Sequence, residues 1–143
     1  MINSIQNYVG KTTETIIADF LREKGYWAYI LPKKVGGQPF DIVACRCNCV
    51  WMVDAKHLES EKASFSFDRI EPNQRTAMMY ARTFANISNI GFAIYWERNT
   101  TQLYFLSYDK WQEMAKQGQK SVKIDDLENF GELIEHNEDS NIK

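Results

Sequence analysis

The stretch 41–56, DIVACRCNCVWMVDAK, constrains the fold most, because two short apolar strands flank a polar turn at 46–48. Both strands are rich in β-branched and aromatic residues, which favour strands. A hairpin centred between Cys47 and Asn48 places Asp41 opposite Asp54, with Cβ atoms roughly 5 Å apart. Lys56 lies two residues beyond Asp54 and therefore on the same face. The sequence thus predicts two carboxylates and a lysine side by side.

Two opposed aspartates in a sheet repel each other, so the pair needs an explanation. One interpretation is a divalent cation held between the carboxylates, with the lysine beside it. Such an oxygen-rich site suits Mg²⁺ or Mn²⁺ better than Zn²⁺. The other interpretation is two solvated, turn-flanking aspartates at strand ends, and the hairpin alone leaves both open.

Composition predicts one globular domain over residues 1–143, since 44% of the residues are apolar and 13% aromatic. No apolar run approaches the ~18 residues that span a bilayer, and the first residues lack the order of a signal peptide. We therefore expect a cytoplasmic protein with no membrane partner. Three closely spaced cysteines, at 45, 47 and 49, fit neither a disulfide framework nor the usual zinc patterns.

Charge is distributed unevenly along the chain, although the formal net charge is only −2. Residues 1–82 carry 11 Lys and Arg against 9 Asp and Glu, and residues 83–143 carry 6 against 10. The predicted carboxylate site lies in the more basic part, where cationic side chains could meet phosphates. The alternative is that these side chains are merely solvated. The candidates are Lys33, Lys34, Arg69, Arg75 and Arg82.

Periodicity and end signals predict the order helix, three strands, helix, two strands, helix. The first helix follows a Thr12 cap and stops at Gly25, and the second begins at Pro72 and reaches 84 or 85. Strands are expected at 26–31, 40–45, 50–56, 90–96 and 103–108, with a short one at 121–124. A short helix capped by Asp109 ends at Gly118, and an acidic tail at about 131–143 is expected to fray. The fold class is therefore α/β, with a mixed β-sheet flanked by helices.

The second helix is expected to bury Ala77, Met78, Ala81 and either Phe84 or Ala85. Exposed aromatic residues would permit a dimer interface, with Trp96, Tyr104 and Trp111 among the candidates.

Two further polar residues lie in first turns of predicted helices. Glu14 shares a face with the apolar stripe of the first helix, so it either has a polar partner or simply complements the helix dipole. Gln74 follows Pro72 closely, and from position alone it is an ordinary surface residue.

The pattern of Asp41 followed by Asp54-Ala55-Lys56 resembles that of the PD-(D/E)xK nuclease superfamily. The chain is also similar, from about residue 10 to 130, to the RecU-type Holliday junction resolvases of Gram-positive bacteria and their phages. The segments that carry this similarity are DAKHLESEKASFSFDRIEPNQ, GFAIYWERNTTQLYFLSYDK and GQKSVKIDDLE. The resemblance implies a restriction-endonuclease-like core, which agrees with the predicted mixed sheet.

The resemblance also implies roles for particular residues. Metal ligands would be Asp41, Asp54 and the backbone carbonyl of Ala55, holding Mg²⁺ with Mn²⁺ able to substitute. Lys56 would position the attacking water or steady the phosphate. The implied catalytic residues are Glu14, Asp41, Asp54, Lys56 and Gln74, and the implied DNA-binding residues are Lys33, Lys34, Arg69 and Arg75.

The implied function is a Mg²⁺-dependent endodeoxyribonuclease that makes paired nicks in four-way DNA junctions as a homodimer, of phage or prophage type. The sequence departs from the family in three ways. Asp54 stands where the family more often has glutamate. The stretch 32–40 is too short for the stalk with which longer members of the family engage the centre of the junction. Only nine residues precede Gly10, so the family's N-terminal basic arm is not seen in this sequence. Two alternatives therefore stay open: a less structure-selective DNA nuclease of the same superfamily, and a non-catalytic nucleic-acid-binding module.

Overall fold

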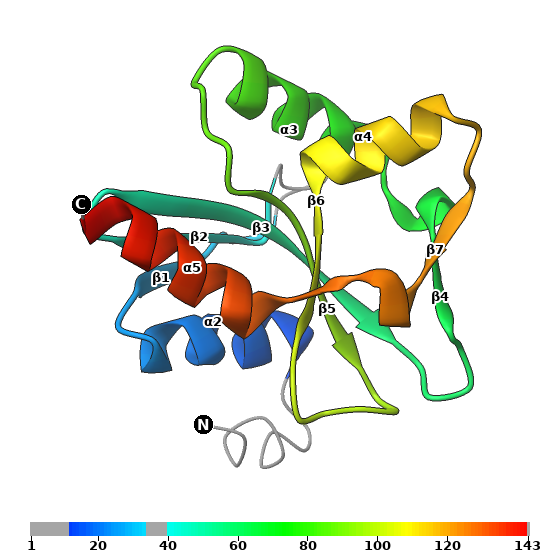
Figure 1. Cartoon of the computed structure of the whole chain (residues 1–143), viewed down its shortest axis with the longest axis horizontal. Helices are drawn as coiled ribbons and strands as arrows, with labels where there is room; N and C mark the ends of the chain where they lie inside the picture. Colours follow the sequence, from blue (N-terminus) through cyan, green and yellow to red (C-terminus); the bar gives the residue numbers. More distant parts are fainter. Residues whose placement is uncertain (1–11, 34–39, 143) are drawn as a thin grey trace.

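The computed structural model describes residues 12–33 and 40–142, with side chains as far as residue 137. A six-stranded sheet carries α2 and α5 on one face and α3 and α4 on the other, and a two-stranded sheet lies beside it (Figure 1). The helices are α2 (Thr13–Glu23), α3 (Pro72–Thr83), α4 (Tyr108–Lys116) and α5 (Phe130–Ile142), with short 3₁₀ turns η1 (Phe67–Arg69) and η2 (Ile124–Asp126). The strands are β1 (Trp27–Ile30), β2 (Ile42–Arg46), β3 (Cys49–Leu58), β4 (Ser64–Ser66), β5 (Ile90–Trp96), β6 (Tyr104–Ser107), β7 (Ser121–Lys123) and β8 (Glu128–Asn129).

The large sheet has the order β1-β2-β3-β5-β6-β8 and is mixed, as the sequence predicts. Only β3 and β5 are parallel, and their neighbours pair antiparallel. A parallel pair needs a long crossover, and here β4, η1 and α3 supply it. This crossover brings the first turn of α3 back beside the end of β3.

The β2–β3 hairpin has the predicted register. Ile42 pairs with Val53 and Arg46 pairs with Cys49, and Cys47 takes a positive φ of 55° in the turn. One step before Ile42, Asp41 therefore lies level with Asp54. The backbone N–H of Asp41 donates to the carbonyl of Val53 at 3.2 Å, which fixes this position.

Each face of the sheet has its own apolar core. The first core packs α2 and α5 on one face, around Trp51 and Phe130. The second packs α3, α4 and the small sheet on the other face, around Phe92 and Phe65. The small sheet pairs β4 with β7, and the sequence indicated β7 but not that partner.

The ends of α2 follow the predicted signals. The side chain of Thr12 accepts a hydrogen bond from the N–H of Thr15, and Gly25 takes the left-handed conformation with φ of 88°. The prediction for α4 was wrong at its start, because Ser107 is the N-cap and Asp109 lies inside the first turn. Asp109 instead pairs with Arg82 of α3 at 3.1 Å.

Burial differs from the sequence predictions at several aromatic residues. Phe84 and Ala85 are exposed, since α3 rises away from the sheet before it reaches them. Trp96, Tyr104 and Trp111, expected to be exposed, are buried in the second core. The backbone of Lys62 accepts the Trp96 indole N–H at 2.9 Å, so burial leaves that polar group satisfied.

The C-terminal segment is a longer helix than predicted. The sequence predicted that the acidic tail at about 131–143 frays, whereas α5 runs from Phe130 to Ile142. Phe130 and Ile134, one turn apart, are fully buried against the first core. Burial of these two side chains stabilises α5, which its acidic sequence alone would not keep helical.

No helix in the described ranges 12–33 and 40–142 has the length and apolar character needed to cross a bilayer.

Gly91 offers a sharp test of the packing between β5 and β6. A Cβ at this position would lie 2.3 Å from the carbonyl oxygen of Leu106 and 2.8 Å from Cα of Ser107. We expect Gly91→Ala to lower the free energy of unfolding by about 3 kcal/mol, because the backbone of β6 must shift. Urea denaturation checks this. Gly131→Ala is the matched control, since its Cβ would meet only side-chain atoms at 3.3 Å, and an unfolding midpoint as low as that of Gly91→Ala would contradict the prediction.

Candidate active site

The candidate site lies where β2 begins, β3 passes and α3 starts. In the described part of the chain, the buried polar and charged side chains are those of Asp41, Asp54, Lys56 and Gln74. Asp41 precedes β2, Asp54 and Lys56 lie on β3, and Gln74 lies in the first turn of α3. Segments far apart in sequence thus bring the four residues into one buried cluster.

Asp41 is fixed by the hairpin itself. Its Oδ2 accepts a hydrogen bond of 2.7 Å from the backbone N–H of Ala55, which lies between Asp54 and Lys56. The carboxylate is therefore held across the strand pair and points toward the Asp54 side, as the register predicted.

Lys56 carries a buried ammonium group with three oxygen partners. Its Nζ lies 3.0 Å from Asp54 Oδ2, 2.8 Å from the carbonyl oxygen of Arg69 and 3.3 Å from Gln74 Oε1. Two of its three N–H donors are used in hydrogen bonds, to the Arg69 carbonyl and Gln74, while the contact with Asp54 is an ion pair. The carbonyl of Arg69 comes from η1, and no sequence signal indicated it.

Gln74 links both sides of the cluster. Its Nε2 donates to Asp54 Oδ1 at 2.9 Å, while its Oε1 accepts from Lys56 Nζ and from the backbone N–H of Glu71 at 3.1 Å. The last contact caps the first turn of α3. The structure therefore places Gln74 in the cluster, and the alternative of an ordinary surface residue is wrong.

Asp54 is the most buried member, with only 1% of its surface exposed. Burial raises the pKa of Asp54 from 3.8 to about 8. A hydrogen bond in which the protonated Asp54 carboxyl donates to Asp41, and the negative charge of Asp41, act in the same direction, whereas Lys56 opposes the shift. Its Oδ2 faces Lys56 but has no partner in hydrogen-bonding geometry. This carboxylate is under-satisfied for a group buried so deeply.

A divalent cation fits these features. It would neutralise the two adjacent carboxylates and ligate the unsatisfied oxygen of Asp54. The described residues contain no group of three His, Cys, Asp or Glu side chains arranged to hold a metal. Mg²⁺ commonly binds through one or two carboxylates and completes its shell with water and substrate phosphate. Asp41 and Asp54 match that requirement.

Glu14 is half-buried in the first turn of α2, and its Oε2 lies 3.6 Å from Nζ of Lys33. It thus has a cationic partner, but it does not complete a three-carboxylate group with Asp41 and Asp54. Its catalytic role stays a prediction. Lys34 lies outside the described residues.

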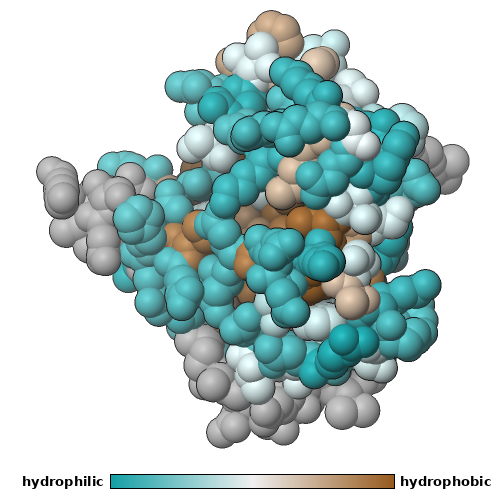
Figure 2. Space-filling view, turned by 45° about the vertical axis from the view of Figure 1, so that its right-hand side comes forward, coloured by the Kyte–Doolittle hydropathy of each residue, from teal (hydrophilic) through white to brown (hydrophobic). Residues whose placement is uncertain are grey.

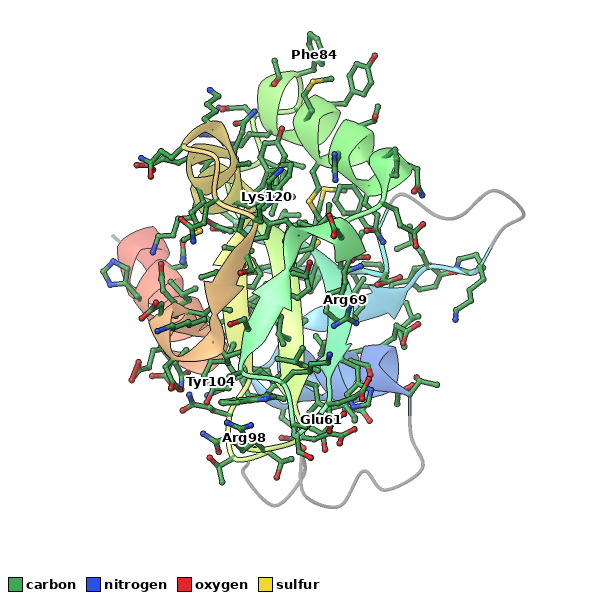
Figure 3. The ribbon with its side chains drawn as sticks, turned by 90° about the vertical axis from the view of Figure 1, so that its right-hand side faces the viewer. Glu61, Arg69, Phe84, Arg98, Tyr104 and Lys120 are labelled. Carbon is green, nitrogen blue, oxygen red and sulfur yellow. The ribbon has the colours of Figure 1, made fainter. Side chains whose placement is uncertain are left out.

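Arg69 and Arg75 have exposed side chains close to the buried cluster. Arg69 supplies the carbonyl to Lys56, and its guanidinium lies 5.6 Å from the centre of the Phe65 ring. Arg75 follows Gln74 and lies 5.7 Å from the centre of the Trp111 ring. Arg69 lies at the middle of the face drawn in Figure 3. Both cations are therefore held on the surface next to the site.

A cavity of about 350 Å³ lies beside Arg69 and is lined by the last residues of β3, His57 and Leu58. It adds Lys62 and the hydroxyl-bearing residues Ser64 and Ser66, which are not among the predicted site residues. The alternation of serine and phenylalanine at 64–67 is the signal that could have found this strand, because it places the serines on the open side.

Comparisons with known proteins identify the family and the fold of this chain. The family described as "Recombination protein U" matches residues 48–143, about two thirds of the chain. The chain belongs to this family. The matched range includes Asp54, Lys56 and Gln74, whereas Asp41 and Glu14 precede it.

Among solved structures, the chain is similar to a 1.6 Å structure of Archaeoglobus fulgidus Hjc, a Holliday junction resolvase from an archaeal hyperthermophile. The TM-score is 0.60 with 16% sequence identity, over 85% of this chain and 96% of that one. This likeness shows a shared fold. A search of curated proteins gave no match.

A larger cavity, of about 750 Å³, lies away from the carboxylates. Its lining comes from the turn between β5 and β6 and from β6, η2, β8 and α5, and most of the lining residues are polar or charged, with Tyr104, Leu127 and Leu133 among them. On the face drawn in Figure 2, hydrophobic residues gather in a central hollow with a hydrophilic rim. None of the predicted site residues lines this cavity.

The raised pKa of Asp54 predicts how cation binding depends on pH. Protons compete with Mg²⁺ for this carboxylate, so the apparent Mg²⁺ affinity should rise by up to about tenfold per pH unit until about pH 8, then level off. Rising pH has the opposite effect on the stability of the metal-free protein. The folded state holds the proton more tightly, so the free energy of unfolding falls as pH rises from 3.8 to about 8. Calorimetric Mg²⁺ titrations across this range check the first effect, and an affinity that stays flat below pH 8 would contradict it.

Proposed function

We propose that the chain is a metal-dependent endonuclease that resolves four-way Holliday junctions as a homodimer, with Mg²⁺ as its ion. The observation that carries the proposal is the buried network of Asp54, Lys56 and Gln74 with Asp41 beside it. A module that only binds DNA has no need to bury two carboxylates and an ammonium group together, because such burial is costly.

In this proposal Asp41 and Asp54 hold the ion, and the backbone carbonyl of Ala55 is a third protein ligand. When bound, Mg²⁺ supplies Lewis-acid stabilisation of the charge that develops on the phosphate oxygens. Lys56 adds a fixed positive charge next to the scissile phosphate, and its contacts with Arg69 and Gln74 keep it from reorienting. Gln74 positions Asp54 through its side-chain N–H.

Exposed cations next to this network supply contacts to the DNA backbone. Arg69 and Arg75 adjoin Lys56 and Gln74, and Lys33 pairs with Glu14 near the start of β2. Lys34 belongs to the same proposed set. Phosphate contacts of this kind position the strand without reading its sequence. Glu14 remains a proposed catalytic carboxylate of this group.

The test is cleavage of a labelled four-way junction, a linear duplex and a flap, with and without Mg²⁺ or Mn²⁺. Symmetric nicks at the junction alone are expected. Equal cutting of all three substrates would indicate a general DNA nuclease. The short stretch 32–40 is the sequence feature that favours this alternative, because it is too short for the family's stalk. No cutting with any metal would indicate a binding module.

A further inference from the structure

The cavity beside Arg69 lies one step along β3 from Lys56. Side chains alternate along a strand, so Leu58 follows Lys56 on the same face, roughly 6.6 Å further along. This distance is close to the spacing of successive phosphates along one DNA strand. The cavity holds about 350 Å³, and its lining residues are His57, Leu58, Glu59, Lys62, Ser64, Ser66 and Arg69.

The loop that carries Lys62 is fixed through its backbone. The carbonyl of Lys62 accepts the indole N–H of the buried Trp96 at 2.9 Å. Two residues earlier, the carbonyl of Ser60 accepts the Nε–H of Arg98 at 2.8 Å. The N–H of Lys62 donates to the carbonyl of Glu59 at 3.1 Å and closes the turn. The exposed ammonium group of Lys62 is therefore presented to the cavity from a backbone that is held in place.

Two hydroxyl groups of β4 line the same cavity. Phe65 is fully buried between Ser64 and Ser66, so strand alternation turns both serines to the opposite side. The Oγ of Ser66 accepts the backbone N–H of Asp68 at 3.3 Å, and its own hydroxyl hydrogen can therefore donate to a ligand. The small sheet thus contributes hydrogen-bond donors beside the ammonium group.

Arg69 connects this cavity with the buried lysine. Its backbone carbonyl accepts from Lys56 Nζ at 2.8 Å, while its guanidinium group lies over the ring of Phe65 and lines the cavity. Arg69 and Lys62 supply two positive charges against the single negative charge of Glu59. The remaining titratable group is His57, whose Nε2 is already paired with Glu97. The balance of charge at the cavity therefore favours an anion.

We infer that this cavity, which we call the flanking-phosphate pocket, binds the backbone phosphate next to the one that is cut, on the same DNA strand. An ammonium group, a guanidinium group and serine hydroxyls are the donors that proteins commonly direct at phosphate oxygens. The pocket is larger than a phosphate alone requires, so the attached sugar has room. The choice of DNA as the source of the phosphate rests on the proposed function.

Occupation of the flanking-phosphate pocket would set which phosphodiester bond is cut. Arg69 contacts the flanking phosphate through its guanidinium group and holds Lys56 through its carbonyl. A strand seated in the pocket thereby brings its neighbouring phosphate to the ammonium group of Lys56. Lys62, Ser64 and Ser66 are in this way positioning residues, which act on the register of the strand and not on the reacting atoms.

Junction binding in EDTA, measured over a range of salt concentrations, tests the pocket without cleavage. We expect Lys62→Ala to weaken binding about fivefold and to reduce the slope of log affinity against log salt by about one, as for the loss of one phosphate contact. Glu59→Gln removes the opposing charge and should tighten binding about threefold. Both side chains are exposed, so thermal unfolding should change little. Lys116→Ala, at an exposed position of α4, is the matched control and should bind like the wild type.

Neutral methylphosphonate linkages, placed one at a time along the exchanging strands, test which phosphate enters the pocket. One linkage beside the cleaved bond should weaken wild-type binding about fivefold, and Lys62→Ala should lose nothing further there, because both changes remove the same contact. Lys116→Ala should show the full loss. Wild-type affinity in Lys62→Ala would overturn the inference, as would an unchanged pattern of interference. The expected binding without cleavage in Mg²⁺ would count against the proposed function alone, whereas cleavage at the same bond with undiminished binding by Lys62→Ala would count against this inference alone.

Discussion

Asp54→Asn is expected to reduce Mg²⁺-dependent cleavage of a four-way junction at least about a thousandfold. Loss of the cation's charge stabilisation removes several kcal/mol from the transition state, and each ~1.4 kcal/mol is a factor of ten. Asparagine keeps the acceptor for Gln74 Nε2 but places a neutral amide 3.0 Å from the ammonium of Lys56. The variant should therefore fold and yet lose its thermal stabilisation by Mg²⁺.

Single-turnover cleavage and melting curves with and without Mg²⁺ measure both effects. Asp68→Asn makes the same chemical change at an exposed carboxylate of η1, and it should leave both readouts within a few-fold of the wild type. If Asp54→Asn bound Mg²⁺ as tightly as the wild type, the assignment of Asp54 as a ligand would be wrong.

Lys56→Met is expected to abolish cleavage while DNA binding survives. Methionine retains much of the side chain's length, but the carbonyl of Arg69 and the carboxylate of Asp54 lose their cationic partner. A lost preorganised charge at a reacting phosphate costs about 10²–10³ in rate. Removing one member of a buried ion pair also costs about 3 kcal/mol of stability. In the proposed function the DNA contacts come from the exposed Arg69 and Arg75, so binding should fall only a few-fold.

Junction binding in EDTA and cleavage in Mg²⁺ separate these effects, with urea unfolding as the check on stability. Lys116→Met removes an exposed lysine from the last turn of α4 and serves as the control. Cleavage by Lys56→Met at close to the wild-type rate would show that the ammonium has a structural role only.

Local signals in the sequence were sufficient for much of the fold. The register of the β2–β3 hairpin followed from a short polar turn between two apolar strands, and it placed Asp41 level with Asp54 correctly. The Thr12 cap and Gly25 stop of α2 were also correct, because helix ends depend on residues within one turn. The resemblance stated from the sequence agrees with the matched family, and the mixed sheet agrees with the structure.

Pairing between distant segments could not be predicted in the same way. The partner of β7 is β4, more than fifty residues earlier, and β8 adds a further strand to the large sheet. The burial of Trp96 and Trp111 depends on the small sheet and on α4, so their aromatic character alone gave the wrong exposure. Phe84 continued the apolar spacing of α3 but lies past the point where the helix leaves the sheet.

The sequence by itself determined the hairpin, the adjacent carboxylates and the lysine beside them, because strand alternation and a tight turn fix those positions locally. Only the tertiary structure decided that Lys56 is held by the Arg69 carbonyl and Gln74, and that burial raises the pKa of Asp54 to about 8. It also decided that Trp27, Tyr29, Tyr80 and Phe84 stay exposed. These properties depend on which distant segments exclude water from a residue, and no local pattern encodes that choice.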